Sequence, residues 1–243
     1  MNDEYEILKV RDKTDLNHIE MGILFDLSFK IAICGKSQLS GKTTLILNLL
    51  LRDKFKYKNF FEGQNIYIVS NNKLDNKISI MMEELEIPEG NLQEFDETSL
   101  DNLYDQLETE HMEEPDHLKK HKLIIFDDCG YSSGLKGTTN TVARLVCNGR
   151  HAMISQIYTA QKYSQLGTVI RSQITGLFLF STSSKELELV EQDVNILENK
   201  KSFLQMVRQN TKERRDFIIV NFTNKYDEVY LNSKFKPISP GLS

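Results

Sequence analysis

The sequence lacks several features that would assign it to particular classes of protein. No apolar run approaches the about 20 residues that a membrane-spanning helix needs. The first residues, MNDEYEILK, lack the apolar region of a signal peptide, so we expect no export and no membrane partner. The three cysteines, Cys34, Cys129 and Cys147, form an odd set without paired spacing. This pattern favours reduced thiols in a reducing compartment.

An excess of positive charge is also missing. The chain has 30 Lys and Arg residues against 35 Asp and Glu residues, a net charge of −5, so no overall basic field indicates a nucleic-acid-binding protein. Any such binding must come from a local patch or from the channel of an oligomer. We find no internal repeat and no low-complexity segment. A length of 243 residues with 40% hydrophobic residues suits one α/β domain with a sizeable core.

The clearest pattern that is present lies in residues 29–51. Phe29–Cys34 is a short apolar run rich in isoleucine, which is typical of a buried strand. Leu45–Leu51 is a second apolar run and is expected to form the body of a helix. Between them lies GKSQLSGKTT, at residues 35–44. A strand, a glycine-bounded loop and Gly-Lys-Thr at a helix start form the context that a phosphate-binding P-loop requires.

Physical chemistry suggests a role for most of this loop. Backbone N–H groups at a helix N-terminus bind anions, and the helix dipole adds to the attraction. Gly41 lets the backbone approach a phosphate, Lys42 reaches the β- and γ-phosphates, and the Thr43 hydroxyl ligates Mg²⁺. The expected nucleotide-binding residues are Gly35, Lys36, Ser37, Gln38, Leu39, Ser40, Gly41, Lys42, Thr43 and Thr44.

The spacing of the two glycines is unusual. The usual pattern has about four residues between them, whereas five residues separate Gly35 from Gly41. Either the loop is one residue longer, or Lys36 replaces the first glycine.

A second signal is the apolar run Leu123–Phe126, which is followed by two carboxylates. Ligands of open α/β sheets bind at the carboxyl ends of strands, so this is a candidate Walker B element. We expect Asp127 to hold Mg²⁺ and Asp128 to position the attacking water. Gln161 follows a predicted strand, Ala152–Thr159. If that strand lies beside the P-loop strand, Gln161 would sense the γ-phosphate; the alternative is a surface polar residue.

The rest of the chain predicts alternating helices and strands. Two further strands are expected at Asn65–Ser70 and Thr175–Ser181, with a terminal hairpin of Asp216–Phe222 and Glu228–Leu231. The expected helices are Asp75–Glu86, Ser99–Glu110, Thr141–Asn148, Ser164–Gln173 and Lys185–Gln209, with Ser99 and Ser184 as N-caps and Gly149 as a C-cap. This order predicts an α/β P-loop NTPase domain at residues 29–231, with a mostly parallel central sheet flanked by helices. An N-terminal arm at 1–28 and a C-terminal tail at 232–243 complete the chain.

The loop Cys129–Thr139 follows the two carboxylates directly, so nucleotide state could move it. Its only charged residue is Lys136, with Gly134 and Gly137 close by. A ring can gather one such basic element from each subunit around a central channel. We therefore predict that Lys136 contacts the DNA backbone; the alternative is a solvated connector.

Taken together, these motifs resemble the genome-packaging ATPases of large DNA viruses and their virophages. These enzymes form the poxvirus-type branch of the FtsK–HerA superfamily, and the likeness is strongest to the Sputnik-type virophages. Four blocks carry the resemblance: GKSQLSGKTT at Gly35–Thr44, LIIFDD at Leu123–Asp128, NGRHAMISQIYTAQKYSQL at Asn148–Leu166, and VIRSQ at Val169–Gln173. The block at Asn148–Leu166 is the most telling, since generic P-loop proteins lack it.

The resemblance implies an ATP-hydrolysing motor that uses ATP and Mg²⁺ and translocates double-stranded viral DNA into a preformed capsid. It implies a homo-oligomeric ring, capsid portal or vertex proteins as partners, and a location in the cytoplasmic virus factory of the infected host cell or in the virion. In such rings an arginine supplied in trans can complete a neighbour's site. Arg150 is the first candidate for this role and Arg171 the second; a surface salt bridge is the alternative for each.

Two other functional classes stay open from the residues alone. A P-loop kinase of a small phosphate acceptor would show turnover that saturates with the acceptor and ignores DNA. A non-hydrolysing nucleotide-binding assembly protein would bind ATP without turnover.

Overall fold

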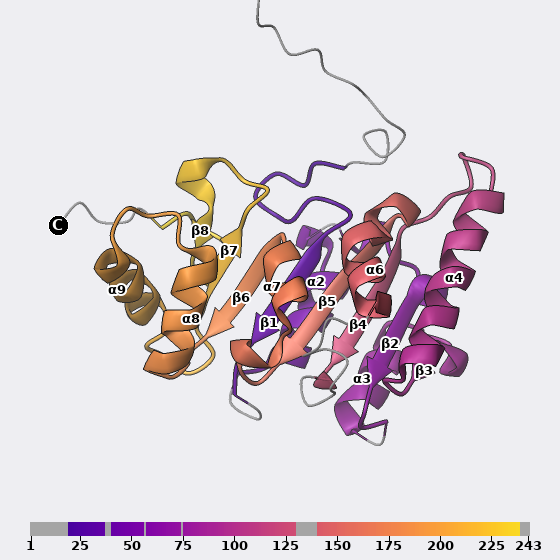
Figure 1. The fold of residues 1–243 in the computed structure, drawn as a ribbon, viewed down its shortest axis with the longest axis horizontal. Helices are drawn as coiled ribbons and strands as arrows, with labels where there is room; N and C mark the ends of the chain where they lie inside the picture. The colour runs from indigo at the N-terminus through magenta and orange to yellow at the C-terminus, as the bar shows by residue number, and fades with distance from the viewer. Residues whose placement is uncertain (1–18, 37–39, 56, 74, 130–139, 239–243) are drawn as a thin grey trace, which may run out of the picture.

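A computed structural model of the chain describes residues 19–36, 40–55, 57–73, 75–129 and 140–238. Within these ranges the strands form one eight-stranded sheet, in the order β3-β2-β4-β5-β1-β6-β7-β8 (Figure 1). The strands are β1 (Lys30–Cys34), β2 (Ile66–Ser70), β3 (Leu92–Gln93), β4 (Lys122–Asp127), β5 (Ile154–Ala160), β6 (Gly176–Phe180), β7 (Phe217–Asn221) and β8 (Tyr230–Leu231).

The first six strands in this order, β3-β2-β4-β5-β1-β6, are parallel to their neighbours. Strand β7 is antiparallel to β6, and β8 is antiparallel to β7. The predicted fold class, a mostly parallel sheet flanked by helices, is confirmed. The predicted terminal hairpin is present as β7 and β8.

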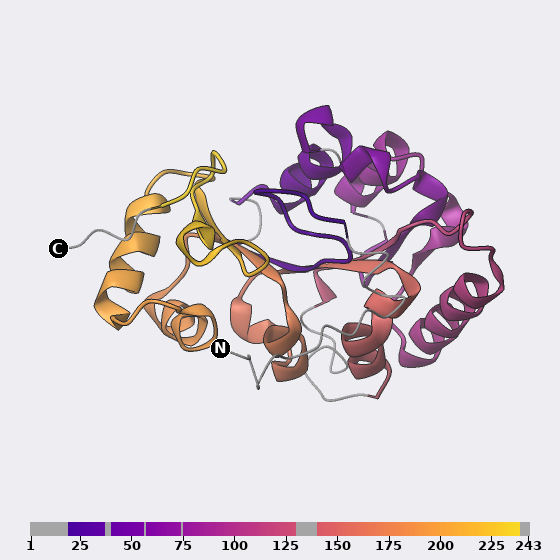
Figure 2. The same ribbon diagram turned by 90° about the horizontal axis from the view of Figure 1, so that it is seen from above.

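Helices cover both faces of the sheet (Figure 2). One face carries α2 (Lys42–Leu51) and α3 (Asn76–Glu84). The other carries α4 (Glu97–Glu113), α6 (Asn140–Asn148), α7 (Thr168–Gln173), α8 (Ser184–Val194) and α9 (Lys200–Asn210). Short 3-10 turns occupy Asp53–Phe55, Tyr57–Asn59, Gly63–Asn65, Glu89–Asn91, Gly149–Ala152, Tyr163–Gln165 and Tyr226–Glu228.

The P-loop strand β1 shows why the sheet needs both layers. Successive side chains of a strand point to opposite faces. Ile31 and Ile33 accordingly pack into the core with α2, while Ala32 and Cys34 pack into the core on the other face. All five residues of β1 are buried, as expected for a parallel strand covered by helices on both sides.

Segments near both ends of the described chain also pack on the α2 face. Phe25 and Leu27 are buried there, and the Tyr57 hydroxyl accepts from the Phe25 N–H at 2.8 Å and donates to the Phe25 carbonyl at 2.9 Å. At the other end, Phe235 packs against the same core, and the Ile238 N–H donates to the Tyr230 carbonyl.

Several expected helix boundaries were wrong, and side-chain capping gives the reason for two of them. The N-cap of α4 is Asp96, whose carboxylate accepts from the Ser99 N–H, so Ser99 lies inside the helix. Ser183, rather than Ser184, caps α8. In both cases the helix begins directly after the residue whose side chain accepts from one of the first free backbone N–H groups.

Two further expectations differ from the structure. The predicted single helix Lys185–Gln209 is two helices, because Asn199 interrupts it by accepting from the Lys201 N–H and capping α9. Gly149 starts a 3-10 turn instead of ending α6 as a C-cap, and the left-handed backbone falls on Met153, with φ 56°.

Candidate nucleotide-binding site

The loop after β1 is shaped by its two glycines. The Gly35 N–H donates to the Ala160 carbonyl at 3.0 Å. A Cβ on Gly35 would lie 2.8 Å from carbons of Phe180 and Ser40, so no larger residue fits there. Gly41 is the N-cap of α2 with φ 79°, a left-handed conformation that favours glycine. Of the expected phosphate-binding residues, Ser37, Gln38 and Leu39 lie outside the described residues.

The Lys42 side chain curls back over this loop. Its ammonium donates to the Gly35 carbonyl at 2.9 Å, and the Ser40 hydroxyl donates to the Lys36 carbonyl at 2.8 Å. Burial lowers the pKa of Lys42, while the nearby Asp128 and Asp127 act in the opposite direction. The loop thus places a half-buried cation beside the N-terminus of α2, which is the arrangement that anions favour.

The two expected carboxylates lie at the carboxyl end of β4. Asp127 is its last residue, and Asp128 follows in a left-handed conformation with φ 49°. Such a backbone is uncommon outside glycine, asparagine and aspartate. It turns the chain sharply after the strand, and both acids line the cleft that also contains Lys42.

Thr159, the sixth residue of β5, connects the two acids. Its hydroxyl donates to Asp127 Oδ1 at 2.9 Å and accepts from the Asp128 N–H at 2.9 Å. The side chain is 1% exposed, so both bonds are shielded from water. Burial raises the pKa of Asp127, and the bond from Thr159 opposes that rise.

Gln161 stands immediately beyond β5, which does pair with the P-loop strand β1. Its amide donates to Asp128 Oδ2 at 3.1 Å. Because β5 lies between β4 and β1 in the sheet, Gln161 sits between the acid pair and the phosphate loop. The proposed sensing role of Gln161 required its strand to lie beside the P-loop strand, and β5 does lie there.

The two acids, Lys42 and the start of α2 meet in a cleft of about 310 Å³ at the carboxyl edge of the sheet. It is lined by Ser40, Gly41, Lys42, Thr43, Thr44, Leu47, Asp75, Lys77, Ile80, Asp127, Asp128 and Arg215. The cleft unites a phosphate-binding helix start, a lysine and two carboxylates, which together can bind a phosphate chain and the cation that accompanies it.

The two arginines singled out from the sequence lie away from this cleft. Arg150 is exposed in the turn that precedes β5, at the opposite edge of the sheet. The seven residues of β5 separate that edge from the cleft, which corresponds to about 20 Å at about 3.3 Å per residue. Arg171 pairs with Asp193 at 2.6 Å and lies over the Tyr163 ring.

Sequence reasoning missed two residues of the site, Thr159 and Arg215. Thr159 lies near the end of a strand that also contains Ser155 and Gln156, so its hydroxyl did not stand out in the sequence. Arg215 enters from the segment between α9 and β7, and its only signal was the basic run of Lys212, Arg214 and Arg215. Lys136, the expected DNA contact, lies outside the described residues.

The fold and the cleft define this chain as a P-loop ATPase. The identification can be narrowed further, because residues 17–234 match the family model of the poxvirus A32 protein. The chain therefore belongs to the poxvirus A32 protein family. No curated protein matches its sequence.

Solved structures share the fold at low sequence identity. The genome packaging NTPase B204 from Sulfolobus turreted icosahedral virus 2, in complex with AMPPCP, is 15% identical with a TM-score of 0.57, over 87% of this chain and 98% of that one. The DNA-packaging ATPase B204 from Sulfolobus turreted icosahedral virus is 17% identical, with the same TM-score and coverage. EssC (ATPases 2 and 3) from Geobacillus thermodenitrificans is 14% identical with a TM-score of 0.50, over 89% of this chain and 41% of that one.

Among the helices of the described ranges, none has both the length and the apolar character that crossing a bilayer requires.

Proposed function

We propose that this ATPase is a motor that translocates double-stranded viral DNA into a preformed capsid. The observation that carries the proposal is the single cleft in which the Gly41–Thr44 helix start, Lys42 and the Asp127–Asp128 pair face one another. Membership of the poxvirus A32 family and the fold shared with a DNA-packaging ATPase support the choice of DNA as the substrate that moves.

Lys42, Asp128 and the neighbouring Gln161 each have a proposed role. Lys42 and the N–H groups at the start of α2 bind the β- and γ-phosphates, with the Lys42 ammonium exchanging the Gly35 carbonyl for a phosphate oxygen. Asp128 accepts a proton or hydrogen bond from the attacking water. Gln161, already bonded to Asp128, reports the presence of the γ-phosphate to that carboxylate.

The cleft fits Mg²⁺ chemically. Thr43 and Asp127 both line it and offer the hard oxygen ligands that Mg²⁺ prefers. The described residues contain no cluster of three or more His, Cys, Asp or Glu that could hold a metal unaided. This agrees with a cation held by one carboxylate, one hydroxyl and the phosphates of the nucleotide. When bound, the ion would neutralise phosphate charge, and Thr159 would keep the Asp127 carboxylate aimed at it.

A ring of subunits accounts for the arginines that lie away from the cleft. Arg150 is exposed at the opposite edge of its own sheet and would act on a neighbour's nucleotide. Arg171 would first have to leave Asp193, to which it is bonded at 2.6 Å. Arg150 therefore stays our first candidate for an arginine supplied in trans.

The remaining parts of the proposal rest on the family resemblance of the sequence. We take residues 29–231 as the ATPase domain, 1–28 as an arm and 232–243 as a tail. The ring would bind capsid portal or vertex proteins and thread DNA past Lys136. A virophage origin and activity in the cytoplasmic virus factory or in the virion are parts of the same proposal.

The decisive experiment measures phosphate release with and without duplex DNA, together with the mass of the particle in solution. The motor predicts ATP turnover that duplex DNA stimulates and a mass that is a multiple of the 28.1 kDa chain. Turnover that ignores DNA but saturates with a small phosphate acceptor would replace the motor by a kinase. ATP binding without turnover in any condition would instead favour a non-hydrolysing nucleotide-binding assembly protein.

A further inference from the structure

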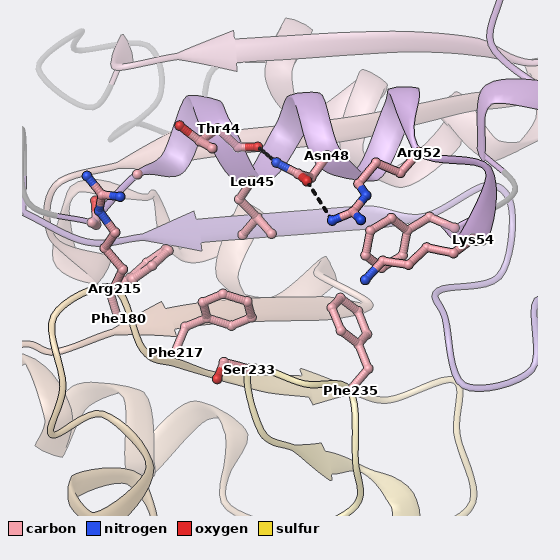
Figure 3. A pocket seen from close by; sticks show the side chains of 13 residues that line it. Thr44, Leu45, Asn48, Arg52, Lys54, Phe180, Arg215, Phe217, Ser233 and Phe235 are labelled. Carbon is pink, nitrogen blue, oxygen red and sulfur yellow. Dashed lines mark hydrogen bonds between the residues drawn. The ribbon is translucent and has the colours of Figure 1, made fainter.

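A second cavity adjoins the cleft that holds the catalytic carboxylates. It has a volume of about 240 Å³ and lies between α2 and the β6–β7–β8 end of the sheet (Figure 3). Four residues line both spaces: Ser40, Gly41, Thr44 and Arg215. A ligand whose phosphates lie at the start of α2 therefore has a continuous path into this cavity.

The long walls of the cavity are apolar. Leu45 of α2 points towards two phenylalanine rings of the C-terminal part of the chain, Phe217 of β7 and Phe235 in the turn after β8 (Figure 3). Other rings brace them: the Phe217 ring centroid lies 5.2 Å from that of Phe180 in an edge-on arrangement, and the Phe235 centroid lies 5.1 Å from that of Phe55 in a tilted one. Phe217 and Phe235 are both half-buried, so each keeps surface available to a ligand. Such braced aromatic surfaces suit a flat, weakly polar group.

The end of the cavity away from the phosphates carries hydrogen-bond donors. Arg52 and Lys54 lie there (Figure 3), and both side chains can only donate. The Asn48 amide donates to the Thr44 carbonyl at 2.7 Å and accepts from Arg52 at 3.4 Å, so one of its donors and one of its acceptor positions are already engaged. A group that fills this cavity should therefore present acceptors at its far edge.

Arg215 stands where the two spaces join. Its backbone has φ 74°, an uncommon conformation for a residue with a side chain and one that structures retain where function requires it. Although its side chain lines both spaces, no ion pair or hydrogen bond of its guanidinium is found with any described residue. A cation that pairs with none of the described residues suits, at this junction, the sugar–phosphate part of a nucleotide.

From this geometry we propose that the cavity between α2 and β7–β8 binds the base of the nucleotide. The base would lie between Leu45 and the rings of Phe217 and Phe235, with Arg215 contacting the phosphates that leave the P-loop. This inference rests on the proposed ATPase site and adds the part of that site which selects a nucleoside over a bare phosphate chain.

Size and chemistry both agree with a base. A cavity of about 240 Å³ is smaller than the about 300–1,000 Å³ typical of pockets for a whole drug-sized ligand, as expected if only a heterocycle enters. Bases stack favourably on aromatic side chains, whatever the base, because every base has a π-face. Their ring nitrogens are acceptors for the donors of Arg52 and Lys54 at the far end of the cavity.

The test compares ADP with pyrophosphate, because the two share the phosphates and differ in the nucleoside and because neither is hydrolysed by the site. Calorimetry with Mg²⁺ should show the wild type binding ADP at least tenfold more tightly than pyrophosphate. Ser233→Phe places a ring in the cavity and should weaken ADP binding at least tenfold, with pyrophosphate affinity unchanged within twofold. Arg214→Ala is the matched control: Arg214 is adjacent to Arg215 but lines neither space, so both affinities should stay at the wild-type value.

Retained pyrophosphate binding shows that the Ser233→Phe protein is folded. If this variant does not fold, hydrogen exchange of the wild type decides instead: ADP, but not pyrophosphate, should slow the amides of residues 231–236. Unchanged ADP affinity in folded Ser233→Phe, or equal protection of 231–236 by both ligands, would overturn the base site while leaving the P-loop intact. A wild type that binds neither ligand would overturn the proposed function and the base site together.

Discussion

Replacing Thr159 by valine should separate nucleotide binding from hydrolysis. The substitution keeps the branched shape in a site that is 1% exposed and removes the hydroxyl that donates to Asp127 and accepts from the Asp128 N–H. A hydrogen bond to a charged group is worth about 1.5–3 kcal/mol. If about 2 kcal/mol of this hydrogen-bond energy stabilises only the transition state, its loss lowers kcat about 30-fold, since about 1.4 kcal/mol is a factor of ten.

The assay is steady-state phosphate release with Mg²⁺–ATP, alongside ADP affinity. Thr159→Val should lower kcat about 10–100-fold and leave ADP affinity within about threefold, because Lys42 and the α2 N-terminus are untouched. Thr159→Ser keeps the hydroxyl and should recover most of the rate, although it loses packing of one methyl group. A folded Thr159→Val protein with wild-type kcat would show that the acids do not depend on β5 for their orientation.

Four further outcomes are expected. Lys42→Ala should abolish ATP turnover, because the γ-phosphate loses its fixed cation; normal turnover in the folded variant would refute the P-loop assignment. Asp128→Asn should keep nucleotide binding and lose hydrolysis, whereas Asp127→Asn should weaken Mg²⁺-dependent binding itself, and identical behaviour of the two would refute this division. Lys136→Ala should keep basal ATPase activity and lose stimulation by duplex DNA, with unchanged stimulation in an assembled ring counting against that loop. Burial lowers the pKa of His121 to about 4 from the ordinary 6.5, so the unfolded chain binds the proton first as the pH falls. The free energy of unfolding, measured by urea titration, should therefore drop by about 2–3 kcal/mol between pH 6.5 and 4, at about 1.4 kcal/mol per pH unit. The same drop in His121→Leu would show that another group causes the loss of stability.

The local patterns of the sequence predicted the parts of the site that lie close together along the chain. Gly41, Lys42 and Thr43 were assigned because an isoleucine-rich strand and a leucine-rich helix flank them. Asp127 was assigned because an apolar strand ends there. In each case a short stretch contains both the reactive residue and the element that positions it, so periodicity and spacing suffice.

Contacts between distant segments were not predictable in the same way. Thr159 acts on a carboxylate 32 residues earlier, and only the pairing of β4 with β5 brings the two together. Arg215 reaches the cleft because β7 runs against its neighbours, a direction that no local pattern of residues 216–222 reveals. The break between α8 and α9 was missed because charged helical residues continue on both sides of it and a single side chain, Asn199, makes the cap.

The antiparallel direction of β7 has a consequence for how the protein can be divided. In a wholly parallel sheet, the segment after α9 would enter its strand at the edge opposite the cleft; here it enters beside the P-loop. Residues between 215 and 235 thus form a wall facing α2, about 170 residues away along the chain. A fragment ending after α9 would keep every recognisable motif yet lose one side of its ligand site.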